Sequence, residues 1–129
     1  MRSFNRKSIG IAFEREIIDF FWKNNGGAIR VAGSGAIRKP SCDIIAKLND
    51  LFAIEAKKTK EDFIYLDKNQ IQDLILFANK MGFEPIIVIK FKKDIKCINA
   101  RNLDLNQECK TIRVSKDDCL NLEEYFLLR

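Results

Sequence analysis

The segment from Ser41 to Lys58 constrains the fold of this chain more than any other part of the sequence. It reads S-C-D-I-I-A-K-L-N-D-L-F-A-I-E-A-K-K, with two short apolar runs on either side of Asn49-Asp50. Apolar runs of this length around turn residues predict a β-hairpin. Side chains alternate along a strand, so Glu55 and Lys57 share one face of the second strand. Because buried charges are costly unless they are paired or bind a metal, we expect chemistry at this strand end.

A second carboxylate, Asp43, opens the first strand, and its position relative to Glu55 depends on the loop. An odd-numbered loop, such as Leu48-Asn49-Asp50, places the two acids opposite each other on one face of the hairpin. A two-residue Asn49-Asp50 turn places them on opposite faces. A shared site therefore requires the odd loop or a β-bulge.

The composition bounds the class of protein. The 129 residues suit one domain, residues 1–129, and 47% hydrophobic with 32% charged residues is ordinary for a globular protein. A net charge of +5 favours a polyanionic partner. The four cysteines have no C-x-x-C spacing, and we see neither a signal-peptide pattern nor an apolar stretch of membrane-spanning length. We therefore expect free thiols, a cytoplasmic location and no membrane contact.

The absence of histidine excludes His-based triads, His general bases and His metal ligands. Any metal would be held by oxygen ligands, which indicates Mg²⁺ or Mn²⁺ rather than zinc.

The first helix is expected from Ile9 to Asn24. Its apolar stripe consists of Phe13, Ile17, Ile18 and Phe21. Glu14 falls near the middle of this stripe, which favours a carboxylate aimed into a site over one that reaches water or pairs with a lysine. Residues 1–7 predict a mobile basic arm before the helix. Its charged residues, which either contact phosphate or are simply solvated, are Arg2, Arg6 and Lys7.

A glycine-rich loop leads from the strand expected at residues 27–32 to Asp43. It contains Ser34 between two glycines, followed by Arg38 and Lys39. No G-K-[ST] follows, so this is not a P-loop. The loop either only connects two strands or closes on phosphate with its backbone N–H groups, Ser34 and the two cations.

The remaining elements predict an α/β fold with a mixed central β-sheet of about five strands flanked by helices. A second helix ends at Met81, and the apolar run from Pro85 to Phe91 predicts a central strand. Further strands are expected at 96–100 and 110–114, and a closing helix at 117–128. Before the second helix, Asp67-Lys68-Asn69-Gln70 forms a capping-box pattern, in which the main expected role of Gln70 is to cap the helix.

The carboxylates and the lysine together indicate phosphodiester hydrolysis. The D/E-x-K pattern also occurs at 94–96 and 108–110, but only Glu55-Ala56-Lys57 follows a strand whose partner opens with an acid. With Glu14 and Asp43, Glu55 can hold one or two divalent ions that polarise the phosphate and acidify a water. Lys57 then orients that water or stabilises negative charge in the transition state.

These pieces resemble the PD-(D/E)xK nuclease superfamily, and more closely the archaeal Holliday junction resolvase family. The matching segments, in chain order, are A-F-E-R at 12–15, R-V-A-G-S-G at 30–35, D-I-I at 43–45, I-E-A-K at 54–57 and the stretch from Tyr65 to Ala78. The resemblance covers residues 8–92. It departs from the family at Cys42, where a proline is usual, and we find no clear match beyond about residue 100.

The resemblance implies a restriction-endonuclease-like fold and a Mg²⁺-dependent enzyme in which Mn²⁺ can substitute. It implies metal ligation by Glu14, Asp43 and Glu55, with the Ala56 carbonyl contributing. Lys57 would be the catalytic lysine and Ser34 the catalytic serine of the loop. The resemblance also keeps open a metal-site contact for Gln70. Arg30 is similar to an arginine that is important for junction handling.

We therefore expect an endodeoxyribonuclease that resolves four-way DNA junctions by paired symmetric nicks during recombination and repair. Another DNA endonuclease of the same fold and a non-catalytic DNA-binding module are the alternatives. Three acids beside a phosphate argue against the module, since they repel the backbone unless a cation neutralises them. The residues expected to contact DNA are Arg2, Arg6, Lys7, Arg30, Arg38, Lys39 and Lys58.

The two-fold symmetry of a four-way junction further predicts a C₂ homodimer, which supplies two sites related by the symmetry of the substrate. Its interface is expected to be apolar. The large apolar residues proposed for it are Phe63, Ile64, Phe83, Phe91, Phe126 and Leu127.

Overall fold

A mixed sheet lies at the centre of the computed structural model, which describes residues 2–32 and 39–128. Its strand order is β1-β2-β3-β5-β6-β8, with β3 and β5 parallel and every other neighbouring pair antiparallel. The sheet strands are β1 (Gly27–Arg30), β2 (Ile44–Leu48), β3 (Asp50–Thr59), β5 (Glu84–Phe91), β6 (Asp94–Asn99) and β8 (Leu120–Asn121). The expected mixed α/β sheet is confirmed, with six strands rather than five.

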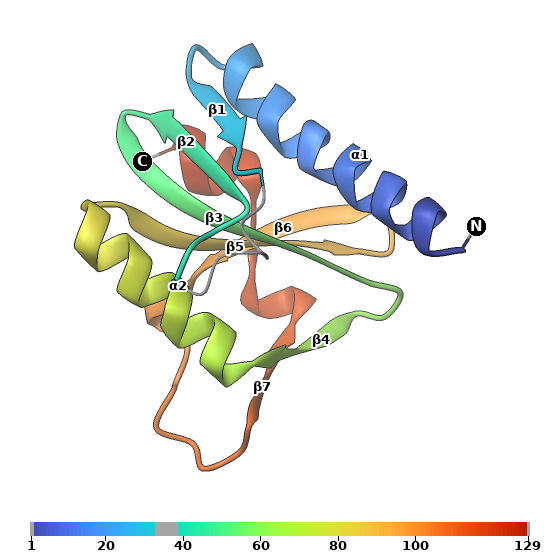
Figure 1. Ribbon diagram of the computed structural model, residues 1–129, viewed down its shortest axis with the longest axis vertical. Coiled ribbons are helices and arrows are strands. Elements are labelled where there is room, and N and C mark those ends of the chain that lie inside the picture. Colours follow the sequence, from blue (N-terminus) through green and yellow to red (C-terminus); the bar gives the residue numbers. More distant parts are fainter. Residues whose placement is uncertain (1, 33–38, 129) are drawn as a thin grey trace.

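Two long helices enclose the sheet from opposite sides, as Figure 1 shows, α1 above and α2 below it. They are α1 (Arg2–Lys23) and α2 (Lys68–Met81). A two-stranded sheet of β4 (Phe63–Asp67) and β7 (Thr111–Ser115) lies beside the start of α2. The remaining elements are short: the 3₁₀ helices η2 (Ala100–Asn102) and η3 (Lys116–Asp118) and the π-helix η4 (Glu123–Leu127).

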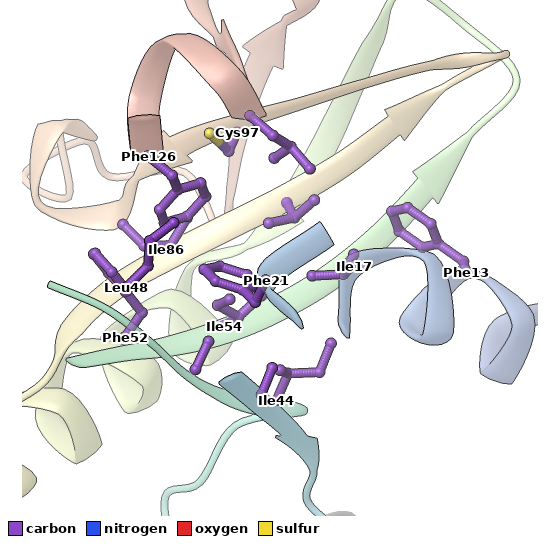
Figure 2. Close-up of a cluster of buried hydrophobic side chains, with 14 residues drawn as sticks. Phe13, Ile17, Phe21, Ile44, Leu48, Phe52, Ile54, Ile86, Cys97 and Phe126 are labelled. Atoms are coloured by element: carbon purple, nitrogen blue, oxygen red, sulfur yellow. The ribbon is translucent and has the colours of Figure 1, made fainter. Parts of the chain in front are cut away.

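The α1 side of the sheet holds one of two apolar cores. The predicted stripe of α1 buries Phe13, Ile17 and Phe21, and Phe126 of η4 packs among them (Figure 2). The rings of Phe21, Phe52 and Phe126 meet edge to face or tilted, with centroids 4.9–6.4 Å apart, a geometry that aromatic quadrupoles favour. This core holds α1 against the sheet and thereby positions the side chains that α1 carries outside the core.

The α2 side holds the second core. The predicted stripe of α2 buries Ile71, Leu74 and Ala78 against the sheet. Leu66 of β4 and Val114 of β7 join the same cluster, so the small sheet is part of this layer. Asp67 caps the start of α2, and Gly82 ends it in the left-handed conformation, φ 77°, that glycine adopts without steric cost.

Two expectations, the start of the first helix and the closing helix, are wrong. The first helix begins at Arg2 rather than Ile9, because no glycine or proline interrupts residues 2–9, so the predicted arm forms the first turns of α1. The strand expected at 110–114 is confirmed as β7, and it pairs with β4 outside the central sheet. The closing helix is replaced by η3, β8 and η4, since β8 pairs with β6 and this tertiary pairing overrides local helix propensity.

Part of the predicted dimer surface is also wrong, because Phe91 and Phe126 are fully buried in the two cores. The thiol prediction is confirmed: all four cysteines are free, and Cys109 alone is exposed. Within the described part of the chain, no helix is long and apolar enough to cross a membrane.

Candidate active site

The hairpin of β2 and β3 has the odd loop that a shared site requires. Lys47 pairs with Leu51 across Leu48-Asn49-Asp50, and the register continues to Ile44 opposite Ile54. Asn49 takes the left-handed conformation at φ 68°, which asparagine tolerates better than most residues. The odd loop required by the parity argument is thus present. Asp43 lies just before β2, and its side chain interacts with that of Glu55.

Asp43 and Glu55 form the centre of the site. The Asp43 backbone N–H donates to the Ile54 carbonyl (2.9 Å), and the Ala56 backbone N–H donates to Asp43 Oδ2 (2.9 Å). Burial, followed by the negative charge of Asp43, raises the pKa of Glu55 from 4.5 to about 7. Two carboxylates held this close favour a shared proton or a shared cation.

Lys57 lies at the edge of this pair. Its Nζ is 3.8 Å from Glu55 Oε2 and donates a shorter hydrogen bond, 2.8 Å, to Gln70 Oε1 at the start of α2. The side chains of Lys57 and Glu55 are 29% and 23% exposed, so both are reachable from solvent without being freely solvated. An ammonium fixed in this way beside two acids can orient a water or stabilise a developing negative charge.

Glu14 approaches from α1, which covers the other face of the sheet. Its Oε1 accepts a hydrogen bond from Arg30 Nε at 2.7 Å, and its side chain is 18% exposed. The negative charge of Glu14 also raises the pKa of Glu55. Its contribution is smaller than the increases caused by burial and by Asp43 and smaller than the decrease caused by Lys57. In this conformation Glu14 is paired with the guanidinium of Arg30. The sequence leaves open a pairing of Glu14 with a lysine, and the observed partner is an arginine instead.

The donor set suits a hard divalent ion held by oxygen. Asp43 and Glu55 supply two adjacent carboxylates. The pKa of Glu55 is raised by burial and then by the negative charge of Asp43, and a bound cation would offset both effects. In the described ranges, 2–32 and 39–128, no three acidic or cysteine side chains are already arranged to hold a metal ion. The structure thus brings together two of the three predicted ligands, while Glu14 is bonded to Arg30.

Comparison with known proteins identifies the family. The model of the archaeal Holliday junction resolvases matches residues 5–129. The chain belongs to the archaeal Holliday junction resolvase family. The match reaches the C-terminus of the chain, so the segment beyond residue 100, for which the sequence showed no clear resemblance, is part of the family pattern.

Individual relatives carry the same assignment. The chain is 39% identical over 88 residues to the crossover junction endodeoxyribonuclease Hjc of Archaeoglobus fulgidus, an alignment of 67% of this chain and 65% of that protein. It is 30% identical over 123 residues to Hje of Saccharolobus islandicus, covering 93% of this chain and 88% of that protein. The crystal structure of A. fulgidus Hjc, a Holliday junction resolvase, superposes with a TM-score of 0.77 at 31% identity, covering 88% of this chain and 94% of that one.

A substitution for the usual proline of this family is accommodated locally. Cys42 is buried, and its thiol donates to the Ile44 carbonyl at a sulfur–oxygen distance of 3.4 Å. Burial raises the pKa of this thiol to about 12, so the cysteine stays neutral beside the two acids. Packing and a side-chain hydrogen bond thus hold the chain ahead of Asp43, where a proline ring would stiffen it.

The residues expected to contact DNA are only partly within the described structure. Ser34 and Arg38 lie outside the described residues, and for Arg2, Arg6 and Lys7 only the helical backbone is described. Arg30, Lys39 and Lys58 are exposed.

Gln70 carries more of the site than its sequence pattern suggested. The predicted N-cap is confirmed, since Asp67 Oδ1 accepts from the backbone N–H groups of Asn69 and Gln70. The Gln70 side chain, however, bonds Lys57 rather than completing the capping box. The signal for this contact lies in the topology, which runs β3, β4 and α2 in succession and returns the first turn of α2 to the end of β3.

Proposed function

We propose that this chain is a structure-selective endodeoxyribonuclease that cuts four-way DNA junctions. The observation that supports this most strongly is the pairing of Asp43 with Glu55 beside Lys57 at the end of one hairpin. Family membership gives the site its substrate, because the named relatives are crossover junction endodeoxyribonucleases. The alternative of a non-catalytic module is disfavoured, since these acids would only weaken the binding of a polyanion.

In the proposed mechanism, Asp43 and Glu55 would hold a divalent ion, Mg²⁺ by preference with Mn²⁺ as a substitute, and the Ala56 carbonyl and Glu14 would complete the ligand set. When bound, such an ion polarises the scissile phosphate and acidifies a water. Glu55 has to lose its proton to serve as a ligand. Glu14 has to exchange its bond with Arg30, which would then be free to contact a phosphate oxygen.

Lys57 supplies positive charge beside the reacting phosphate without binding the ion, because an ammonium has donors and no acceptor. Ser34 is proposed as the catalytic hydroxyl of the loop. The cations proposed to track the DNA backbone are Arg2, Arg6, Lys7, Arg30, Arg38, Lys39 and Lys58. Contacts of this kind fix the register of the duplex arms and give salt-dependent affinity.

The decisive experiment compares Asp43→Asn with wild type on a four-way junction and on a linear duplex. We expect Asp43→Asn to lower the single-turnover cleavage rate about 100-fold or more while junction binding is unchanged or tighter, because one metal ligand and one repulsive charge are removed together. The matched control is Asp73→Asn, an exposed acid on α2, which should cut at the wild-type rate.

Chelation of divalent ions should abolish cleavage, and Mg²⁺ should restore it. Equal cleavage of junction and linear DNA by the wild type would favour another endonuclease of this fold. An Asp43→Asn variant that cuts at the wild-type rate would contradict the site itself.

We also propose that the chain acts as a C₂ homodimer. Beyond the buried cores, several large apolar side chains remain exposed on the α2 side of the sheet. They include Ile29 of β1, Leu51 at the hairpin and Met81 at the end of α2, which are 61%, 40% and 53% exposed. An isologous contact through this side would cover them and supply two sites for one junction.

A further inference from the structure

The Lys57–Gln70 hydrogen bond is solvent-exposed and joins β3 to the first turn of α2. Lys57 has two acceptors within reach, the Glu55 carboxylate at 3.8 Å and the Gln70 amide oxygen at 2.8 Å. The neutral amide is the closer partner, although the carboxylate attracts the ammonium more strongly at equal distance. The position of Gln70 therefore decides where the Lys57 ammonium lies.

Two sets of contacts hold the first turn of α2, where Gln70 lies: the N-cap formed by Asp67 and the pairing of β4 with β7. Its own N–H donates to Asp67 Oδ1 at 3.2 Å, within the N-cap of α2. Asp67 in turn ends β4, opposite Thr111 of β7, and the Lys68 N–H donates to the Lys110 carbonyl at 2.9 Å. The segment beyond residue 100 thus braces the first turn of α2 through the small sheet, and the first turn of α2 carries Gln70.

The space beneath the contact leaves little freedom for another arrangement. A cavity of about 10 Å³ lies between β3, β5 and α2, bounded by Lys57 and Gln70 and floored by Leu66, Leu74 and Ile87. A cavity of that size has room for at most about one water. Glu55 and Asp67 also line the cavity, so a Lys57 ammonium that lost the amide would move toward a carboxylate or into solvent rather than into the apolar part of the lining.

From these contacts we propose that Gln70 is a positioning residue that holds the Lys57 ammonium at the mouth of the site, closer to the amide than to the Glu55 carboxylate. A neutral acceptor can do this without cancelling the charge of the lysine, and it leaves two of its three donors for phosphate or water. It also keeps the ammonium at 3.8 Å from Glu55, beyond hydrogen-bonding distance, so that the carboxylate is left able to bind a cation. This inference rests on the proposed nuclease function for its catalytic consequence, whereas the positioning itself does not.

The test uses Gln70→Met, which keeps the length of the side chain and its helix propensity but removes the acceptor. We expect single-turnover cleavage of a four-way junction to slow about 10-fold, as is typical when the partner of an active-site group is removed. Junction affinity and melting temperature should stay within error of wild type. Gln72→Met is the matched control, because Gln72 is exposed on the same helix, and it should cut at the wild-type rate.

A second readout follows the lysine itself in metal-free protein without DNA. The rate of acetylation of Lys57 by an amine-reactive ester, quantified by peptide mass spectrometry, should differ at least about threefold between Gln70→Met and wild type, because the ammonium is no longer held. It should rise if the lysine is released into solvent and fall if it pairs more closely with Glu55. Gln70→Glu, which keeps an acceptor oxygen at the same reach, should label at the wild-type rate.

Unchanged Lys57 labelling in Gln70→Met would overturn the positioning role, as would a loss of junction affinity or melting temperature that matches the loss of rate. If wild-type protein fails to cut any DNA, the proposed nuclease function fails, and the labelling comparison still decides whether Gln70 holds Lys57.

Discussion

At the scale of single residues, Glu55 sets an electrostatic cost that pH controls. Burial and the charge of Asp43 raise its pKa in the folded chain to about 7, against 4.5 for the free side chain. Between these pH values the folded state binds more protons than the unfolded state. The folded state is therefore most stable, as far as this group is concerned, below about pH 4.5, and that stabilisation is lost as the pH rises through 7.

We predict that Glu55→Gln, which cannot ionise, removes this loss. In metal-free buffer the variant should be more stable than wild type at pH 8 by about 1–3 kcal/mol, with a smaller difference at pH 5. Urea unfolding at the two pH values measures the effect, and Glu61→Gln, an exposed acid, serves as the control that should change neither value. A gain of the same size at both pH values would mean that Glu55 titrates normally in the fold.

The residue scale also shows how far the sequence can predict the site. Glu55 and Lys57 follow from strand alternation, because a period of two decides which side chains share a face, whereas Asp43 joins them only because the hairpin loop is odd. The bond between Glu14 and Arg30 does not follow, since it joins α1 to β1 across a distance that only packing defines. The local sequence pattern predicts the N-cap bond of the Gln70 backbone N–H, whereas the Gln70 side chain bonds Lys57 of β3, a contact that the local pattern does not contain.

At the scale of elements, the β2–β3 hairpin holds the two acids in register through one strained position. Asn49 lies at φ 68° in the middle of the loop. A β-branched side chain is disfavoured there by its clash with the following carbonyl, whereas glycine is not.

We predict that Asn49→Val lowers the free energy of unfolding by about 1–2 kcal/mol, while Asn49→Gly stays within about 0.5 kcal/mol of wild type. Chemical denaturation of the two variants is the measurement, and the glycine variant is the internal control. A valine variant as stable as wild type would show that the loop can take another conformation, and the register of Asp43 and Glu55 would then need another explanation.

The elements themselves were predictable in proportion to their local signals. The stripe of α2 is predictable from its helical periodicity, β5 from its nearly continuous apolar run, and the end of α2 from Gly82. The C-terminal segment was misread as a helix, because Leu120 and Asn121 satisfy their backbone by pairing with β6. The separate β4–β7 sheet has no local signal that distinguishes it from the central one, since strand partners are chosen by topology.

At the scale of the whole molecule, the apolar residues divide between core and surface in a way that composition could not show. Ten phenylalanines suggested more apolar bulk than one small sheet can bury. The structure buries Phe91 and Phe126 completely, so these two do not support an interface. The apolar side chains that remain exposed on the α2 side support an interface; among them are Ile29, Leu51 and Met81.

These residues belong to one side of the sheet. Ile29 pairs with Ile45, which packs against the same core as α2, so both lie on the α2 side. Leu51 shares its face with Ala53 of that core, two positions further along β3. Lys57 and Gln70 also meet on this side, so a two-fold contact here would place both sites on one assembly.

We predict that the protein sediments at micromolar concentration and moderate salt, without DNA, with twice the 15.0 kDa mass of one chain. Met81→Asp should shift the equilibrium toward the monomer, because it places a charge in an apolar contact that excludes water. Leu128→Asp, at a more exposed position outside the α2 side, is the control and should leave the dimer intact. The monomeric variant should still nick junctions but lose the pairing of its nicks. A wild-type species of one-chain mass that still makes paired nicks would show that no preformed dimer is needed.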